Sequence, residues 1–211
     1  MADALQIARR LGNTVAQTTA AGNELAEQIV AQGLPPYAEM TRKGNGWQVM
    51  SVAAVAGLVV RPSGTAAFEI WNGNNTGGRS LIVTRMFWFN LVAAQVAQGF
   101  TGWAQVTAAK AAPAAGANVN VRGNSGKAYS GSVIAALGTT VTDSGWFPWA
   151  VGSTKAIEAT VTPNGGAVTG DLAGFLIVPP QCSLCLHAVA QTTASTFTQG
   201  AGWYEEQITI E

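Results

Sequence analysis

The chain has 211 residues, of which 48% are hydrophobic and only 10% are charged, and its formal net charge is zero. This length holds one large β-domain, or an ordinary domain with an extension, and the hydrophobic fraction is sufficient for a core. Because soluble domains typically carry about 25% charged residues, the composition disfavours a freely soluble monomer and favours a protein whose surface is largely covered by other subunits.

The first 40 residues differ in pattern from the rest and predict an N-terminal arm with one short helix. Asn23 is suited to cap a helix that ends at about Gly33. Leu25, Ile29 and Val30 would form its apolar face. Since isolated helices of this length are marginal in water, we expect these side chains to contact either the protein's own body or a neighbouring subunit. The alternative is a tail that is partly disordered.

Residues 41–211 are predicted to form an all-β domain, an antiparallel β-sandwich of jelly-roll type. In this part, β-branched and aromatic residues are bounded by clusters of Gly, Pro, Asn and Ser. No helical period separates them, so parallel βαβ units are not expected. The predicted strands cover residues 47–60, 66–72, 81–92, 100–108, 118–122, 132–137, 139–143, 156–162, 170–178, 183–191 and 201–210.

The zero net charge conceals an uneven distribution along the chain. Residues 41–155 hold nine Lys or Arg against Glu69 and Asp143, whereas residues 156–211 hold five acidic residues and no basic one. Such opposite charge either favours association between copies or is balanced inside the sheet, where strands distant in sequence become neighbours.

Targeting signals and membrane spans are not expected. No basic and then apolar leader follows Met1, and no run of about 18 apolar residues occurs. Cys182 and Cys185 are the two cysteines and do not make a disulfide framework. These features predict an intracellular site of assembly.

The residues that carry redox, metal or nucleophilic chemistry are few. His187 is the single histidine, and no Gly-x-Ser-x-Gly turn provides it with a nucleophile. Cys182 and Cys185 are three positions apart in a β-like segment, where such side chains point to opposite faces. We therefore expect no redox pair, no metal site and no cofactor.

Acidic and basic residues do not indicate an enzyme or a nucleic-acid-binding protein either. A glycoside hydrolase needs two paired carboxylates, and the candidates in the β-domain are scattered. Basic residues are dispersed, which disfavours specific binding of nucleic acid. The segment 122–127 lacks the first glycine and the Ser or Thr of a phosphate-binding loop. The scattered candidates are Glu69, Asp143, Glu158 and Asp171.

Trp146, Phe147 and Trp149 form the densest aromatic cluster of the sequence. Such a cluster can close the open end of a sandwich as part of its core. It can also anchor a subunit interface or form a platform on which a sugar stacks. All three interpretations remain open at this point.

Three stretches resemble small structural proteins of tailed bacteriophages, namely residues 61–74 (RPSGTAAFEIWNGN), 176–180 (LIVPP) and 202–205 (GWYE). The resemblance is one of style over residues 41–205, with few charges, many small residues and a short arm. It implies a capsid decoration or cement protein, or a protein of the neck or tail, and in such proteins trimers are common.

We therefore expect a virion structural protein that is not an enzyme, most of all a decoration or cement protein that stabilises the shell through subunit contacts. Its partners would be copies of itself, as a homotrimer, and the major capsid protein or other virion proteins, without a membrane or a specific nucleic acid. Assembly would take place in the host cytoplasm. The alternatives are a carbohydrate-binding or receptor-binding module, a jelly-roll capsid, neck or tail protein, and a β-sandwich hydrolase.

Overall fold

The computed structural model describes most of the β-domain and little of the arm. No helix within the described ranges is both long and apolar enough to cross a membrane. The described residues are 38–93, 97–107, 112–113, 119–123, 126, 128–129, 131–154 and 166–208.

The chain divides into two units between Lys43 and Gly44. In the first unit, the structure describes one helix, α3 (Ala38–Arg42), which the sequence did not predict. The predicted arm helix lies outside the described residues, and with it the expected contact residues Leu25, Ile29 and Val30.

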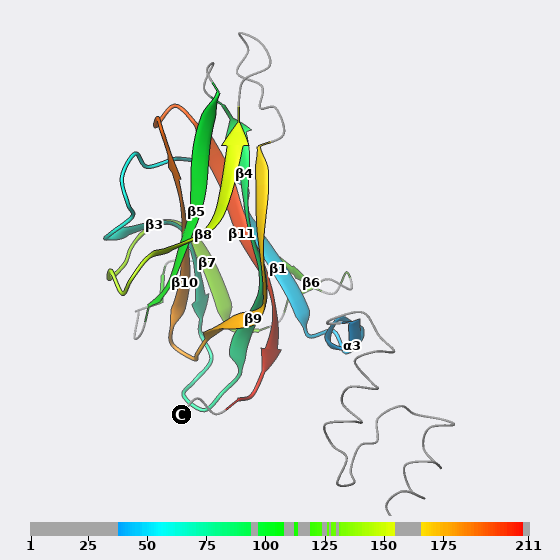
Figure 1. Ribbon diagram of the computed structural model, residues 1–211. Helices are drawn as coiled ribbons and strands as arrows, with labels where there is room; N and C mark the ends of the chain where they lie inside the picture. Colours follow the sequence, from blue (N-terminus) through cyan, green and yellow to red (C-terminus); the bar gives the residue numbers. More distant parts are fainter. Residues whose placement is uncertain are drawn as a thin grey trace, which may run out of the picture. The chain divides into compact units, whose positions relative to one another are not determined.

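The second unit forms two antiparallel sheets that pack face to face (Figure 1). The first sheet has the strand order β6-β1-β11-β4-β9, with β2 also paired to β11, and the second has the order β7-β3-β10-β5-β8. The prediction of an all-β antiparallel sandwich is confirmed. The strands are β1 (Gly46–Ser51), β2 (Val55–Ala56), β3 (Thr65–Asn72), β4 (Ser80–Val92), β5 (Gln98–Thr107), β6 (Val119–Gly123), β7 (Val133–Thr140), β8 (Phe147–Thr154), β9 (Ala167–Val178), β10 (Ser183–Ala190) and β11 (Thr196–Glu206).

The strand pairing is that of a jelly roll. Strand β1 pairs with β11, β3 with β10, β4 with β9 and β5 with β8. These four pairs are the first and last, second and seventh, third and sixth, and fourth and fifth strands of an eight-stranded ribbon that wraps into two sheets. Strands β6 and β7 lie between β5 and β8 in sequence and extend the two sheets at the edges opposite β9 and β8.

One hydrophobic core fills the space between the sheets. Inward side chains alternate along each strand, as in β4, where Met86 and Trp88 are fully buried. The rings of Phe100 and Phe197 lie 4.9 Å apart and link the two sheets. Each such large side chain contributes about 1.5–3 kcal/mol when it is fully removed from water. The core therefore holds the two sheets together as one rigid scaffold.

Four of the predicted strands differ clearly from those observed. The strand predicted over residues 201–210 is β11, which begins at Thr196 and ends at Glu206. The run 47–60 is not one strand, because β1 ends at Ser51 and only the short β2 follows before β3. Residues 132–137 and 139–143 were predicted as two strands, but β7 continues through Gly138, whose φ is +64°. Residues 141–146 then leave the sheet as a loop.

Strand β8 was not predicted, although it begins inside the aromatic cluster at Phe147. Pro148 and the bulky residues around it obscured the strand signal, since proline is depleted in strands and confined to edges and bulges. The predicted strand over residues 156–162 lies outside the described residues.

Candidate functional site

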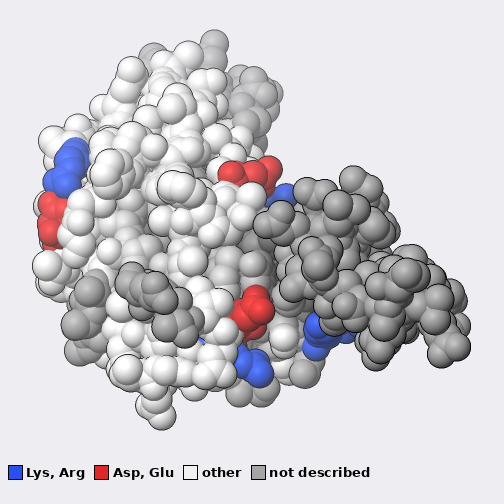
Figure 2. Space-filling view, turned by 60° about the horizontal axis from the view of Figure 1, so that its bottom comes forward, with Lys and Arg blue, Asp and Glu red and all other residues white. Residues whose placement is uncertain are grey.

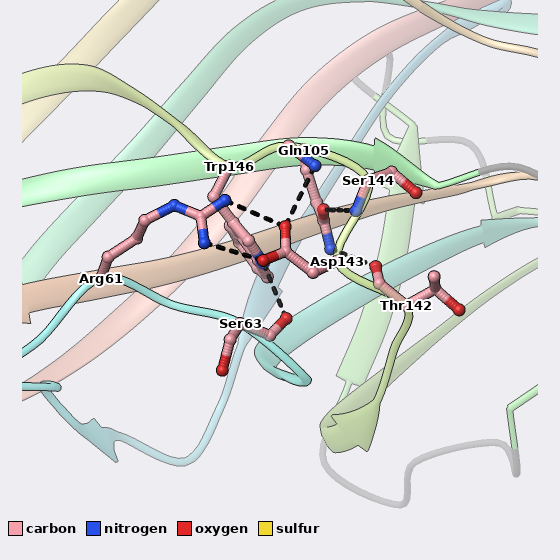
Figure 3. Close-up of polar contacts among 8 residues, drawn as sticks. Arg61, Ser63, Gln105, Thr142, Asp143, Ser144 and Trp146 are labelled. Carbon is pink, nitrogen blue, oxygen red and sulfur yellow. Dashed lines mark hydrogen bonds and ion pairs between the residues drawn. The ribbon is translucent and has the colours of Figure 1, made fainter.

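The side chain of Gln105 on β5 binds the loop before β8 to the second sheet (Figure 3). Its amide nitrogen donates to the carbonyl of Thr142 at 2.9 Å. Its amide oxygen accepts from the backbone N–H of Ser144 at 2.8 Å. The side chain thus pairs with the loop as a neighbouring strand would, and it is almost fully buried while doing so.

Two further contacts fix the same loop to the segment that precedes β3 (Figure 3). The indole N–H of Trp146 donates to the carbonyl of Ser63 at 2.9 Å. The guanidinium of Arg61 donates to both carboxylate oxygens of Asp143, at 2.7 and 3.0 Å. These hydrogen bonds hold the pKa of Asp143 below its ordinary value and raise that of Arg61. The start of β8 is therefore well fixed.

Strands β8 and β9 are edge strands (Figure 1). Among the described residues, β9 is the last strand of the first sheet and β8 is the last strand of the second. Both edges are interrupted. Pro148 in β8 has no N–H to offer to a further strand. In β9, residues 172–175 form a bulge opposite Thr84, because the pairing passes from Val83 with Leu176 to Arg85 with Asp171. Bulges and prolines are devices by which edges avoid further strand pairing.

The bulge in β9 directs Phe175 toward β8. It contains two positive φ angles, +49° at Ala173 and +86° at Gly174. Leu172 points into the core, whereas Phe175 is 79% exposed. The ring of Phe175 packs on that of Trp149 with an interplanar angle of 60°, and the ring centroids are 6.1 Å apart.

These edges carry four exposed or half-buried large apolar side chains, which we call the edge ridge: Phe147, Trp149, Val151 and Phe175. Trp149 is half-buried, and the other three are among the most exposed large apolar side chains of the described chain. Strand β8 carries no charged residue. Strand β9 carries only Asp171, which pairs with Arg85 at 3.0 Å.

A second apolar surface lies on the outer side of the first sheet. Met50, Gly200 and Phe87 lie opposite one another on β1, β11 and β4. Phe89 and Leu91 continue the row along β4. We call Met50, Phe87, Phe89 and Leu91 the sheet face. Because Gly200 has no side chain, the ring of Phe87 lies across it.

Charged side chains are sparse on the visible surface. Figure 2 shows one side of the molecule, on which a few separate blue and red spots are surrounded by uncharged atoms. Arg61 pairs with Asp143, and Arg85 pairs with Asp171. A surface of this kind offers apolar and hydrogen-bonding contacts but little electrostatic attraction for a charged partner.

The predicted aromatic cluster is divided by the structure. Trp146 is buried against Ala66, Val141 and Cys185, so its ring belongs to the interior. Phe147 is exposed and Trp149 is half-buried against the main core. The structure therefore brings Trp149 together with Phe175, which the sequence did not suggest.

The predicted redox and histidine candidates lie in or beside β10. Cys182 precedes the strand and Cys185 is buried within it, 3.8 Å from the hydroxyl of Thr107, and the two cysteines do not form a disulfide with each other. His187 is buried, its Nδ1 lies 3.0 Å from the carbonyl oxygen of Ala188, and burial lowers its pKa. Among the described residues, no three His, Cys, Asp or Glu side chains gather as a metal site would require.

The carboxylate candidates occupy separate settings. Glu69 is buried on β3, where it accepts a hydrogen bond of 2.6 Å from the hydroxyl of Ser183. Asp143 and Asp171 are each paired with an arginine. Glu158 lies outside the described residues. The three described candidates thus lie on β3, in the loop before β8 and on β9, and each has a different partner.

Sequence reasoning missed Phe175 and the sheet face. Two signals could have indicated them. In residues 80–92, apolar side chains occupy both alternating sets of positions, which is typical of a strand that is covered on both faces. Gly174 inside a strand indicates a bulge, which re-aims the side chain that follows.

Comparison of the chain with protein-family models, with curated proteins and with solved structures finds no match.

Proposed function

We propose that this protein is a structural subunit of a larger assembly, and that the assembly is a virion in which the chain acts as a decoration or cement protein. The observation that carries the proposal is the edge ridge. Its side chains are apolar, strongly exposed and not accompanied by an unpaired charge. Large exposed apolar side chains on the edge strands of both sheets favour a protein contact.

The scaffold beneath the edge ridge suits this role because it is fixed before any partner binds. Gln105 and Trp146 hold the loop that leads into β8. Trp149 packs on the ring of Phe175 and also on the core. A surface that is ordered in advance loses little conformational entropy when it associates, so a small apolar patch can contribute a lasting contact.

The extension from an assembly subunit to a virion protein rests on the resemblance of residues 61–74, 176–180 and 202–205 to bacteriophage structural proteins. A jelly roll with few charges is also suited on physical grounds to form part of a protein shell. A shell protein makes permanent lateral contacts, and uncharged surfaces with many small residues allow close packing between subunits.

The test is quantitative mass spectrometry of virus particles purified from a culture in which the viral genome encodes this chain. We expect the intact chain in many copies per particle, retained after a wash in about 1 M salt, because apolar contacts are not screened. An abundant host protein measured in the same sample controls for contamination. Absence of the chain from washed particles would contradict the virion role.

A further inference from the structure

The described part of this chain carries two apolar surfaces at different places on the fold. The edge ridge lies on β8 and β9, where the two sheets end, and the sheet face lies on the outside of the first sheet. One contact between unlike surfaces would bury both kinds in every copy.

The interruptions of β8 and β9 argue against a contact in which two edges pair as strands. Pro148 removes a backbone donor from β8, and the bulge at residues 172–175 breaks the regular ladder of β9. Strand addition needs an uninterrupted row of backbone donors and acceptors. The edge ridge is therefore suited to contacts through its side chains and not to backbone pairing with another edge.

The exposed area also favours unlike surfaces. Phe147, Val151 and Phe175 are 64%, 75% and 79% exposed, and at roughly 150–250 Å² for an aromatic side chain they offer on the order of 400 Å². When the edge ridge meets the sheet face, each copy also buries its own sheet face, which adds on the order of 200 Å². A ring therefore buries on the order of 600 Å² per copy, whereas a pair of edge ridges leaves the sheet face of each copy exposed.

Charge identifies the kind of partner. A partner for the edge ridge must itself be apolar and nearly uncharged, because β8 has no charge and Asp171 of β9 is already paired with Arg85. An acidic or basic partner would lose hydration without gaining a counter-charge. The sheet face meets this requirement, since its four side chains are Met50, Phe87, Phe89 and Leu91.

We propose that the edge ridge of one copy packs on the sheet face of a second copy, and that repetition of this contact closes a ring. The inference rests on the proposed function and names the partner that the edge ridge takes. A contact between unlike surfaces leaves one free surface at each end until the ring closes, and closure by rotation then prevents open-ended growth. Each copy in the ring contributes one edge ridge and one sheet face.

The experiment uses the full chain and two variants, each with one surface altered. Phe175→Asp places a charge on the edge ridge, and Met50→Asp places a charge on the sheet face. Both positions are exposed, so both variants are expected to fold. Masses are measured by light scattering after size-exclusion chromatography. We expect the unaltered chain to be oligomeric and each variant alone to be monomeric.

Mixing the two variants gives the decisive result. The Met50→Asp copy retains its edge ridge and the Phe175→Asp copy retains its sheet face, so one sound contact can form between them. We expect a complex with one copy of each. If the edge ridge paired with itself, Met50→Asp would remain oligomeric alone and mixing would restore nothing.

Controls separate the contact from effects on folding and from the proposed function. Val60→Asp adds the same charge at an exposed apolar residue outside both surfaces, and it should leave the mass unchanged. Phe89→Asp provides a second alteration of the sheet face, and circular dichroism checks the fold of each variant. An unaltered chain that is monomeric throughout would contradict the proposed function itself. An oligomer that survives both Phe175→Asp and Met50→Asp would overturn only the ring.

Discussion

Tyr129 donates a hydrogen bond of 2.8 Å to the carboxylate of Glu205, and this contact joins β11 of the first sheet to the segment that leads into β7 of the second. The same phenol oxygen accepts from the backbone N–H of Val133 at 3.0 Å. The ring packs edge-on against Trp47, with centroids 4.7 Å apart. One side chain thus fastens the two sheets of the jelly roll at the side opposite the edge ridge.

This contact predicts how stability depends on pH. Burial, and then the charge of Glu205, raise the pKa of Tyr129 above its ordinary value of about 10. The folded state therefore favours the neutral phenol. Its contribution is complete below about pH 10 and is lost as the pH rises further, because the phenol of the unfolded chain ionises first.

The variant Tyr129→Phe tests this assignment. It removes the hydroxyl that donates to Glu205 and accepts from Val133, so we expect the free energy of unfolding at neutral pH to fall by about 1–3 kcal/mol. Urea unfolding is measured at about pH 8 and again above about pH 10. The unaltered protein should lose more stability over this interval than the variant, and equal losses would show that Tyr129 does not set the pH dependence.

The amide of Gln105 is expected to be essential for the loop before β8. In Gln105→Glu, the oxygen that accepts from Ser144 remains, but the donor to the Thr142 carbonyl is replaced by an acceptor. We expect a destabilisation of about 1–3 kcal/mol, since the group is buried. Gln48→Glu, at an exposed amide on β1, is the matched control. Thermal unfolding measures the stability of both variants, and equal melting temperatures would show that Gln105 does not hold the loop.

Close packing between the sheets predicts a difference between two glycines of β5. A Cβ atom at Gly102 would lie 2.3 Å from the ring of Trp88, whereas at Gly99 the nearest atom is 3.9 Å away. Gly102→Ala should therefore destabilise the fold by about 1–3 kcal/mol. Gly99→Ala should change stability little. Denaturant unfolding of the two variants measures the difference, and a tolerated Gly102→Ala would mean that the sheets lie farther apart here.

The bulge in β9 links backbone conformation to association. Gly174 has a φ of +86°, and a Cβ atom there would lie 3.0 Å from the side chain of Ile82. We expect Gly174→Val to cost about 1–3 kcal/mol, and to shift Phe175 away from Trp149. Gly64→Ala, where the nearest atom is 3.9 Å away, is the control. If association and Trp fluorescence of Gly174→Val match those of the control, the bulge does not position the edge ridge.

The sequence predicted the fold class well because local signals mark most strands. Clusters of turn residues bound β3, β4 and β10 within about two residues of their observed ends. It failed at β8, where Pro148 and three bulky aromatic residues suggested a cluster instead of an edge strand. An edge strand tolerates proline because one side of it needs no hydrogen bonds.

The candidate site was less accessible to sequence reasoning because it depends on pairing between distant strands. Trp146 and Trp149 are three residues apart, yet one is buried under a loop and the other supports the edge ridge. Trp146 donates to the carbonyl of Ser63 and Trp149 packs on Phe175, and both partners are remote in sequence. Strand register places Met50, Gly200 and Phe87 in one row. This register is set by the whole sandwich and not by the local sequence.

The central claim is that the protein works as an assembly of its own copies. Its most direct test is the solution mass of the full chain, measured by light scattering over a wide range of protein and salt concentrations. We predict a single species whose mass is a whole multiple of 21.7 kDa, three copies being the number that the phage resemblance implies, and it should persist at high salt because the contact is apolar. A mass of 21.7 kDa at every concentration would contradict the account.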